Sequence, residues 1–212
     1  MNRLSMLLFV LLSGAVLRAG AQESDPINES LKLVPDTKLA KVFMDPDADF
    51  KRYTKFAILE PYVAFRKHWE RDHRDVRTSD MDRIKRGLAN LFLEEFQTAI
   101  EADGYQLVEG AGEDVLVLRP ALIDLDVAAP DVRSAGRTTN YVANAGAVTL
   151  YVEVLDSSTG AVLARVIDRK AARDTVTFQI ANSVYNSAEA RKIIKYWAET
   201  LRNGFKELHN RP

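Results

Sequence analysis

The chain has 212 residues and no cysteine, and its 29 lysines and arginines balance 30 aspartates and glutamates to a formal net charge of −1. A chain with so little net charge has no overall positive potential that would attract nucleic acid or anionic lipid, so we expect neither as a partner. The absence of cysteine excludes disulfides, a catalytic thiol and a cysteine-linked lipid, so we expect no lipid anchor.

The N-terminus has the three parts of a secretory signal peptide. Arg3 supplies a positive charge, residues 4–17 are mostly apolar, and Ala19, Gly20 and Ala21 are small enough for a signal peptidase. The apolar run is shorter than the roughly 20 residues that span a bilayer. We therefore predict a signal peptide over residues 1–21, cleavage near Ala21–Gln22, and a periplasmic or secreted protein without a transmembrane helix in its mature chain.

The segment after the signal peptide is polar. Prolines at positions 26, 35 and 46 interrupt residues 22–50, which we interpret as an extended leader, at best partly ordered. The pattern of a folded protein begins after it. We therefore predict a single α/β domain over residues 51–212.

The first half of this domain contains a strand and a helix. Residues 55–60 form a compact apolar run that Pro61 ends, as in a buried strand. Apolar residues then recur at helical spacing as far as Asp103-Gly104. Ser79 and Asp82 resemble a capping box, so we expect an amphipathic helix to begin there.

The second half contains four further strands and a second helix. Residues 105–108 and 115–127 predict two strands, and Pro120 indicates an edge position or a bulge in the second. Residues 148–154 and 162–166 alternate as in a hairpin. The final helix has a polar cap at Asn186 and Ser187 and an apolar inner face formed by Ala190, Ile194, Trp197, Leu201, Phe205 and Leu208.

The predicted order is β-α-β-β-β-β-α. This order indicates an α+β fold in which two amphipathic helices pack on a largely antiparallel sheet. If the strands alternate in direction, residues 128–144 and 172–185 leave one end of the sheet, and residues 61–80 leave the other.

The hairpin and the last helix carry a resemblance. Residues 154–165 and 167–170, together with Tyr196-Trp197-Ala198-Glu199 and Leu201-Arg202, resemble a family of uncharacterised bacterial envelope proteins, mostly predicted lipoproteins. The resemblance implies an α/β periplasmic domain tethered to the outer membrane. This chain departs from the family pattern because it lacks the cysteine for lipid attachment. The hairpin followed by a helix is also similar to accessory domains of envelope transport or assembly machines.

One charged segment is the first candidate surface. Residues 66–75 hold two of the three histidines and one of the two tryptophans. Tryptophan and arginine are enriched where binding energy concentrates. We therefore expect a partner-binding patch formed by His68, Trp69, Arg71, His73 and Arg74.

The spacing of the histidines argues against a metal site. His68 and His73 are five residues apart and would not face one metal ion from a helix, so we expect no metal and no cofactor. A hydrolase or small-ligand site that uses His68, His73 and nearby carboxylates is the alternative.

A second candidate site lies in two long connections. Residues 128–144 exceed an ordinary loop and lack periodicity. An anionic ligand or glycan would be bound by Arg133, Arg137, Tyr141, Phe178 and Tyr185.

The chain has no G-x-S-x-G elbow, phosphate loop, dinucleotide fingerprint or H-E-x-x-H motif. Our first hypothesis is therefore a non-catalytic envelope binding or accessory protein that engages another envelope protein through these loops. A third possibility is a self-associating structural subunit, in which the edge at residues 162–167 pairs with another copy. The sequence leaves the oligomeric state open.

Overall fold

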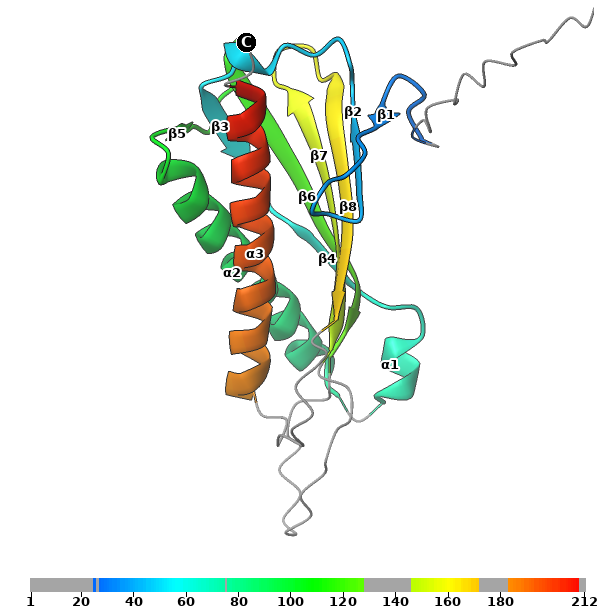
Figure 1. The fold of residues 1–212 in the computed structure, drawn as a ribbon. Helices are drawn as coiled ribbons and strands as arrows, with labels where there is room; N and C mark the ends of the chain where they lie inside the picture. Colours follow the sequence, from blue (N-terminus) through cyan, green and yellow to red (C-terminus); the bar gives the residue numbers. More distant parts are fainter. Residues whose placement is uncertain (1–24, 26, 75, 128–145, 172–182, 210–212) are drawn as a thin grey trace, which may run out of the picture.

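The computed structural model describes residues 25, 27–74, 76–127, 146–171 and 183–209, without the side chains of residues 183–187. Figure 1 shows α2 and α3 side by side on one face of a twisted sheet. The strands are β1 (Lys32–Leu33), β2 (Lys41–Met44), β3 (Lys55–Ile58), β4 (Tyr62–Phe65), β5 (Gln106–Leu107), β6 (Val115–Asp126), β7 (Ala147–Asp156) and β8 (Val162–Ala171). The helices are the 3-10 turn η1 (Phe50–Arg52), α1 (Trp69–Asp72), α2 (Thr78–Glu101) and α3 (Ser183–His209).

The sheet is mixed but mainly antiparallel. Its strands lie in the order β1-β2-β8-β7-β6-β3-β5, and β4 pairs with β6 beyond the end of β3. β3 runs parallel to β5 and β6, and β4 also runs parallel to β6. The predicted α+β class, with two amphipathic helices on a largely antiparallel sheet, is confirmed.

The core lies between the sheet and the two long helices. Alternate residues of the central strands point toward the helices and are fully buried, as period-2 patterning requires. From the helices, Phe92 and Phe96 of α2 and Trp197 of α3 pack against them. The buried strand residues include Leu116, Leu122, Leu150 and Val152.

The structure differs from the predicted leader at residues 22–50. β2 pairs antiparallel with β8, and Phe43 and Leu39 are buried in the fold. Prolines at positions 35 and 46 lie outside the two short strands, so they interrupt the pattern without excluding the segment from the sheet. The free hairpin edge expected at residues 162–167 is also wrong, because β2 covers it.

A row of charges crosses the face of the sheet opposite the helices. Arg165, which is 3% exposed, donates to Asp25 and to Glu153, and the latter contact is 2.7 Å. Arg119 donates to Glu153 from the other side. Burial alone would raise the pKa of Glu153, but hydrogen bonds from Arg165 and Arg119 outweigh it and lower that pKa. Asp25 thereby fixes the N-terminal segment to the sheet.

Pro120 occupies the interior of the sheet, although its strand was expected at an edge or bulge. β6 pairs with β3 up to Leu118 and with β4 from Ala121, so Pro120 lies between the two neighbours. The Leu118 carbonyl points toward β3 and β4, because it accepts a hydrogen bond from the Leu59 amide. Pro120 is two residues further along the strand, so its nitrogen points toward the same side. The N–H that proline lacks would therefore face the gap between the end of β3 and the start of β4.

β4 was absent from the predicted order, and it changes the layout of the loops. Because β4 runs parallel to β6, it ends beside Leu125 rather than at the opposite end of the sheet. The following helix α1 consequently lies near the end of β6 (Figure 1). The expectation that residues 61–80 leave the opposite end from residues 128–144 is wrong.

Candidate functional site

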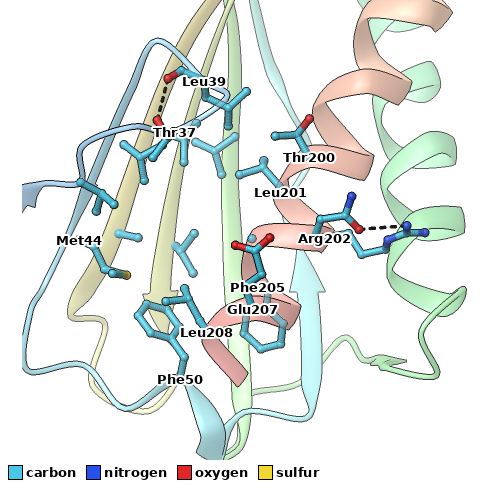
Figure 2. Close-up of a pocket in the computed structure, with 18 of the residues that line it drawn as sticks. Thr37, Leu39, Met44, Phe50, Thr200, Leu201, Arg202, Phe205, Glu207 and Leu208 are labelled. Atoms are coloured by element: carbon cyan, nitrogen blue, oxygen red, sulfur yellow. Dashed lines mark hydrogen bonds between the residues drawn. The ribbon is translucent and has the colours of Figure 1, made fainter. Parts of the chain in front are cut away.

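A cavity of about 530 Å³ lies between the C-terminal half of α3 and the sheet. Its floor is formed by inward-facing residues of five strands, and its roof is formed by α3 (Figure 2). The floor residues are Val42, Met44, Phe56, Leu116, Leu118, Val152, Val154, Ala164 and Val166, and the apolar roof residues are Ala198, Leu201, Phe205 and Leu208.

The cavity follows from a change in burial along α3. Ile194 and Trp197 in the middle of the helix are fully buried against the sheet. One turn later the same helix face carries Leu201, Phe205 and Leu208, which are only half-buried although they point toward the sheet. These side chains therefore retain accessible apolar surface inside a concavity, which is how a site for an apolar ligand is built.

Residues 34–40, which we term the strap, connect β1 to β2 and close one side of the cavity. The strap turns at Asp36, whose φ of 55° lies in the left-handed region. The Thr37 hydroxyl donates to the Leu39 carbonyl at 2.8 Å, and the buried Leu39 side chain lines the cavity. The strap contributes three polar residues to the lining, Asp36, Thr37 and Lys38.

Two contacts hold the strap against α3 and β8. The Tyr196 hydroxyl donates to the Lys38 carbonyl at 3.1 Å. The buried Asp168 carboxylate accepts from the Ala40 amide at 2.9 Å and from Trp197 Nε1 at 2.7 Å. Asp168 therefore joins the strap, β8 and α3 at one point, and the hydrogen bond from Tyr196 holds the middle of the strap to the helix at the surface.

Polar side chains mark the mouth of the cavity. Asp36, Thr37 and Lys38 of the strap are exposed, and Thr200, Gly204 and Glu207 of α3 follow one another at helical spacing. A Cβ placed at Gly204 would meet no atom within 4 Å, so the helix leaves open space there. The mouth therefore lies between the strap and α3.

Aromatic side chains close the other end of the cavity. Phe205 packs edge-on against Phe56 and Tyr105, with ring centroids 4.9 and 5.2 Å apart, and Phe50 lies 6.4 Å from the same ring. Burial, followed by the charge of Asp103, raises the pKa of Tyr105, so its hydroxyl stays neutral. The cavity thus offers a polar mouth and an apolar, aromatic closed end.

The first predicted patch is divided between surface and interior. Trp69 is 0% exposed and stacks on Phe65 at 4.1 Å, while its Nε1 donates to the Val127 carbonyl at 3.1 Å. Its indole is therefore an anchor for α1 rather than an exposed contact for a partner. His73 stacks on Trp69 at 4.2 Å and is half-buried. His68, with a left-handed φ of 68°, lies on the surface together with Arg71 and Arg74.

Ion pairs hold this segment to the end of β6. Arg66 lies 3.0 Å from both Asp72 and Asp126. The hydrogen bonds that Arg66 donates to Asp72 and then to Asp126 raise the pKa of Arg66. Within the residues that the structure describes, no group of three or more histidine and acidic side chains is placed to hold a metal ion.

The second predicted site falls largely outside the described residues. Arg133, Arg137, Tyr141 and Phe178 belong to the segments that the structure does not describe. Tyr185 was expected in a loop, but its backbone belongs to the first turn of α3, which begins at Ser183. The cavity residues were not predicted as a site. The signals in the sequence were Gly204 within a helix and the mostly apolar residues 39–44 between Pro35 and Pro46.

The family model described as "Protein of unknown function (DUF3313)" matches residues 24–201. No curated protein matches the chain. No helix within the described ranges combines the length and apolar character needed to cross a bilayer.

Several solved structures match the chain at low identity. The PelC dodecamer from Paraburkholderia phytofirmans is 14% identical, with 70% of this chain and 89% of that chain covered and a TM-score of 0.40. A protein from Caulobacter crescentus described as a candidate lipoprotein is 13% identical, with coverages of 77% and 96% and a TM-score of 0.37. A DUF4136 family protein from Bacteroides thetaiotaomicron is 11% identical, with coverages of 81% and 98% and a TM-score of 0.35.

Proposed function

The chain belongs to the DUF3313 family, and we propose that it is an exported, non-catalytic protein of the cell envelope that binds an apolar ligand. The observation that carries this proposal is the cavity beneath α3. Its volume of about 530 Å³ falls within the range of small-molecule sites. Its inner part consists of apolar and aromatic side chains, as is typical of sites that bind small apolar molecules.

Export rests on the N-terminal sequence. The charge at Arg3, the apolar run and the small residues ending at Ala21 support cleavage before Gln22 and release into the periplasm or beyond. Cell fractionation followed by N-terminal sequencing tests this part. We expect the periplasmic protein to begin at Gln22. An intact Met1 in the cytoplasmic fraction would contradict export.

Ligand binding can be tested with a matched pair of glycine variants. Gly204 lies at the mouth of the cavity, whereas Gly87 lies on the exposed face of α2, and neither would place a Cβ within 4 Å of another atom. Purified protein is titrated with the fluorescent apolar dye 1-anilinonaphthalene-8-sulfonate. We expect saturable binding at one site, weakened at least about five-fold in Gly204→Leu because the new side chain competes for space. Gly87→Leu is expected to bind as the wild type does. Equal binding by both variants would place the dye elsewhere.

A second function is favoured by the position of α1. β4 brings the exposed His68, Arg71 and Arg74 to the end of the sheet where β6 ends, so exposed side chains with hydrogen-bond donors stand at one end of the sheet. We propose this end as the surface that engages an envelope protein, as expected for an accessory protein. Cross-linking in intact cells tests it. Loss of a specific partner in Arg71→Ala with Arg74→Ala, but not in the exposed control Arg83→Ala, would support it, and unchanged recovery would refute it.

A further inference from the structure

The cavity extends across most of the sheet. Residues from β2, β8, β7, β6 and β3, which are neighbours in that order, all contribute to its floor. Neighbouring strands lie about 4.8 Å apart, so the floor extends about 19 Å across the sheet. The floor is therefore broad enough for an extended chain to lie across the strands.

Polarity is distributed unevenly along this length. The strap lies beside β2 and supplies Asp36, Thr37 and Lys38, and the floor at the opposite end is formed by Phe56 and its aromatic neighbours. The remaining polar lining residues, Thr200, Arg202, Asn203 and Glu207, all belong to α3 above the floor. A ligand that satisfies both ends has a polar head at the strap and an apolar tail that points toward β3. The charges at the mouth include both signs, so the head is selected mainly by its polarity.

We infer that the cavity binds a single unbranched acyl chain, which enters between the strap and α3 and lies across the strands with its head at the mouth. This inference rests on the proposed function, because it names the class of apolar ligand for the same cavity. Gly204 opens the helix side of the entrance, and the hydrogen bond from Tyr196 to Lys38 holds the strap side. Movement of the strap away from α3 would break that exposed hydrogen bond and uncover part of the Leu39 side chain, while Asp168 keeps the end of the strap in place.

The test is a chain-length series. Fatty acids from eight to sixteen carbons are titrated below their micelle concentrations, with dye displacement or calorimetry as the readout. Each methylene that enters the cavity should tighten binding about four-fold, which corresponds to about 0.8 kcal/mol per buried CH₂. The gain should stop once the tail reaches the aromatic end. A lysophospholipid of equal chain length distinguishes a free fatty acid from a chain carried by a phospholipid.

A matched pair of variants locates the chain. Ala164 lies on the cavity floor, whereas Ala121 lies on the opposite face of the sheet. We expect Ala164→Leu to lose the gain for the longest chains and Ala121→Leu to retain it, with circular dichroism verifying that both fold.

Three outcomes overturn the inference. The first is affinity that does not depend on chain length, and the second is an equal effect of both alanine variants. The third is binding of the compact dye without binding of any acyl chain, which would leave the proposed function standing and remove only the acyl chain. Absence of binding by the dye and by every chain would refute the proposed function itself.

Discussion

Replacing Asp25 with alanine tests whether the N-terminal segment is part of the folded unit. Asp25 and Arg165 are 1% and 3% exposed, and their side chains form a buried ion pair. Removing one partner of such a pair costs about 3–5 kcal/mol because the other charge is left buried. Glu153 lies 2.7 Å from Arg165 and still compensates part of its charge, so we expect the lower value, about 3 kcal/mol.

Urea unfolding followed by circular dichroism measures this change. For a chain of this size a loss of about 3 kcal/mol also lowers Tm by roughly 6–12 °C. The exposed Asp47 provides the control, and we expect Asp47→Ala to change stability by less than about 0.5 kcal/mol. If Asp25→Ala behaved like this control, the buried pair would contribute nothing, and the segment before β1 would not belong to the folded unit.

Four further changes have defined outcomes. Tyr53→Phe removes a buried 2.6 Å hydrogen bond to Asp156 and should lower the free energy of unfolding by about 1.5–3 kcal/mol in urea, whereas an unchanged midpoint would speak against the bond. The hydrogen bond from Tyr53 and the others to Asp156 lower its pKa from 3.8 to about 2, so a contribution of about 2 kcal/mol is present above pH 4 and is lost as the pH falls toward 2. If lowering the pH from 4 to 2 reduced the free energy of unfolding of the wild type no more than that of Asp156→Asn, Asp156 would not be the group responsible. Gly87→Ala and Gly204→Ala should each raise stability by about 0.5–1 kcal/mol, and a destabilised Gly204→Ala would mean that the mouth is closed. Tyr196→Phe should speed ligand dissociation about five-fold in stopped-flow measurements, the equivalent of one hydrogen bond of about 1 kcal/mol, and an unchanged rate would argue against the strap as the gate.

Regular hydrophobic periodicity made most elements of the domain predictable. The strands at β3, β6, β7 and β8 and the two long helices all follow apolar patterns that suit their burial, and they were found within a few residues. Helix starts were less certain. α2 begins at Thr78 after Arg77, which makes no side-chain cap, so the capping pair expected at Ser79 and Asp82 does not set the start.

Short elements that depend on tertiary contacts were not predictable in the same way. β4 has only four residues and follows Pro61, and its pairing with β6 is a long-range contact without a local signal. β2 is equally short and is held by β8, while Asp25 is held by an arginine 140 positions later. Polar composition therefore made residues 25–50 resemble a leader.

The role of Trp69 in the first candidate patch, and the cavity, were missed for a related reason. Tryptophan and arginine near His68 indicated a binding surface, but Trp69 fills the space beneath α1 and donates to Val127. The cavity is built from residues whose pattern looked like an ordinary core, such as Leu201 and Phe205. Only the structure shows that this face of α3 remains half-buried.

The most direct test of the account is a crystal structure of the mature protein grown with dodecanoic acid. We predict continuous density for one extended chain beneath α3, in contact with Leu201 and Phe205, with its carboxylate between the strap and Thr200. A cavity that stays empty at saturating ligand, or density confined to the opposite face of the sheet, would contradict the claim that this cavity binds an acyl chain.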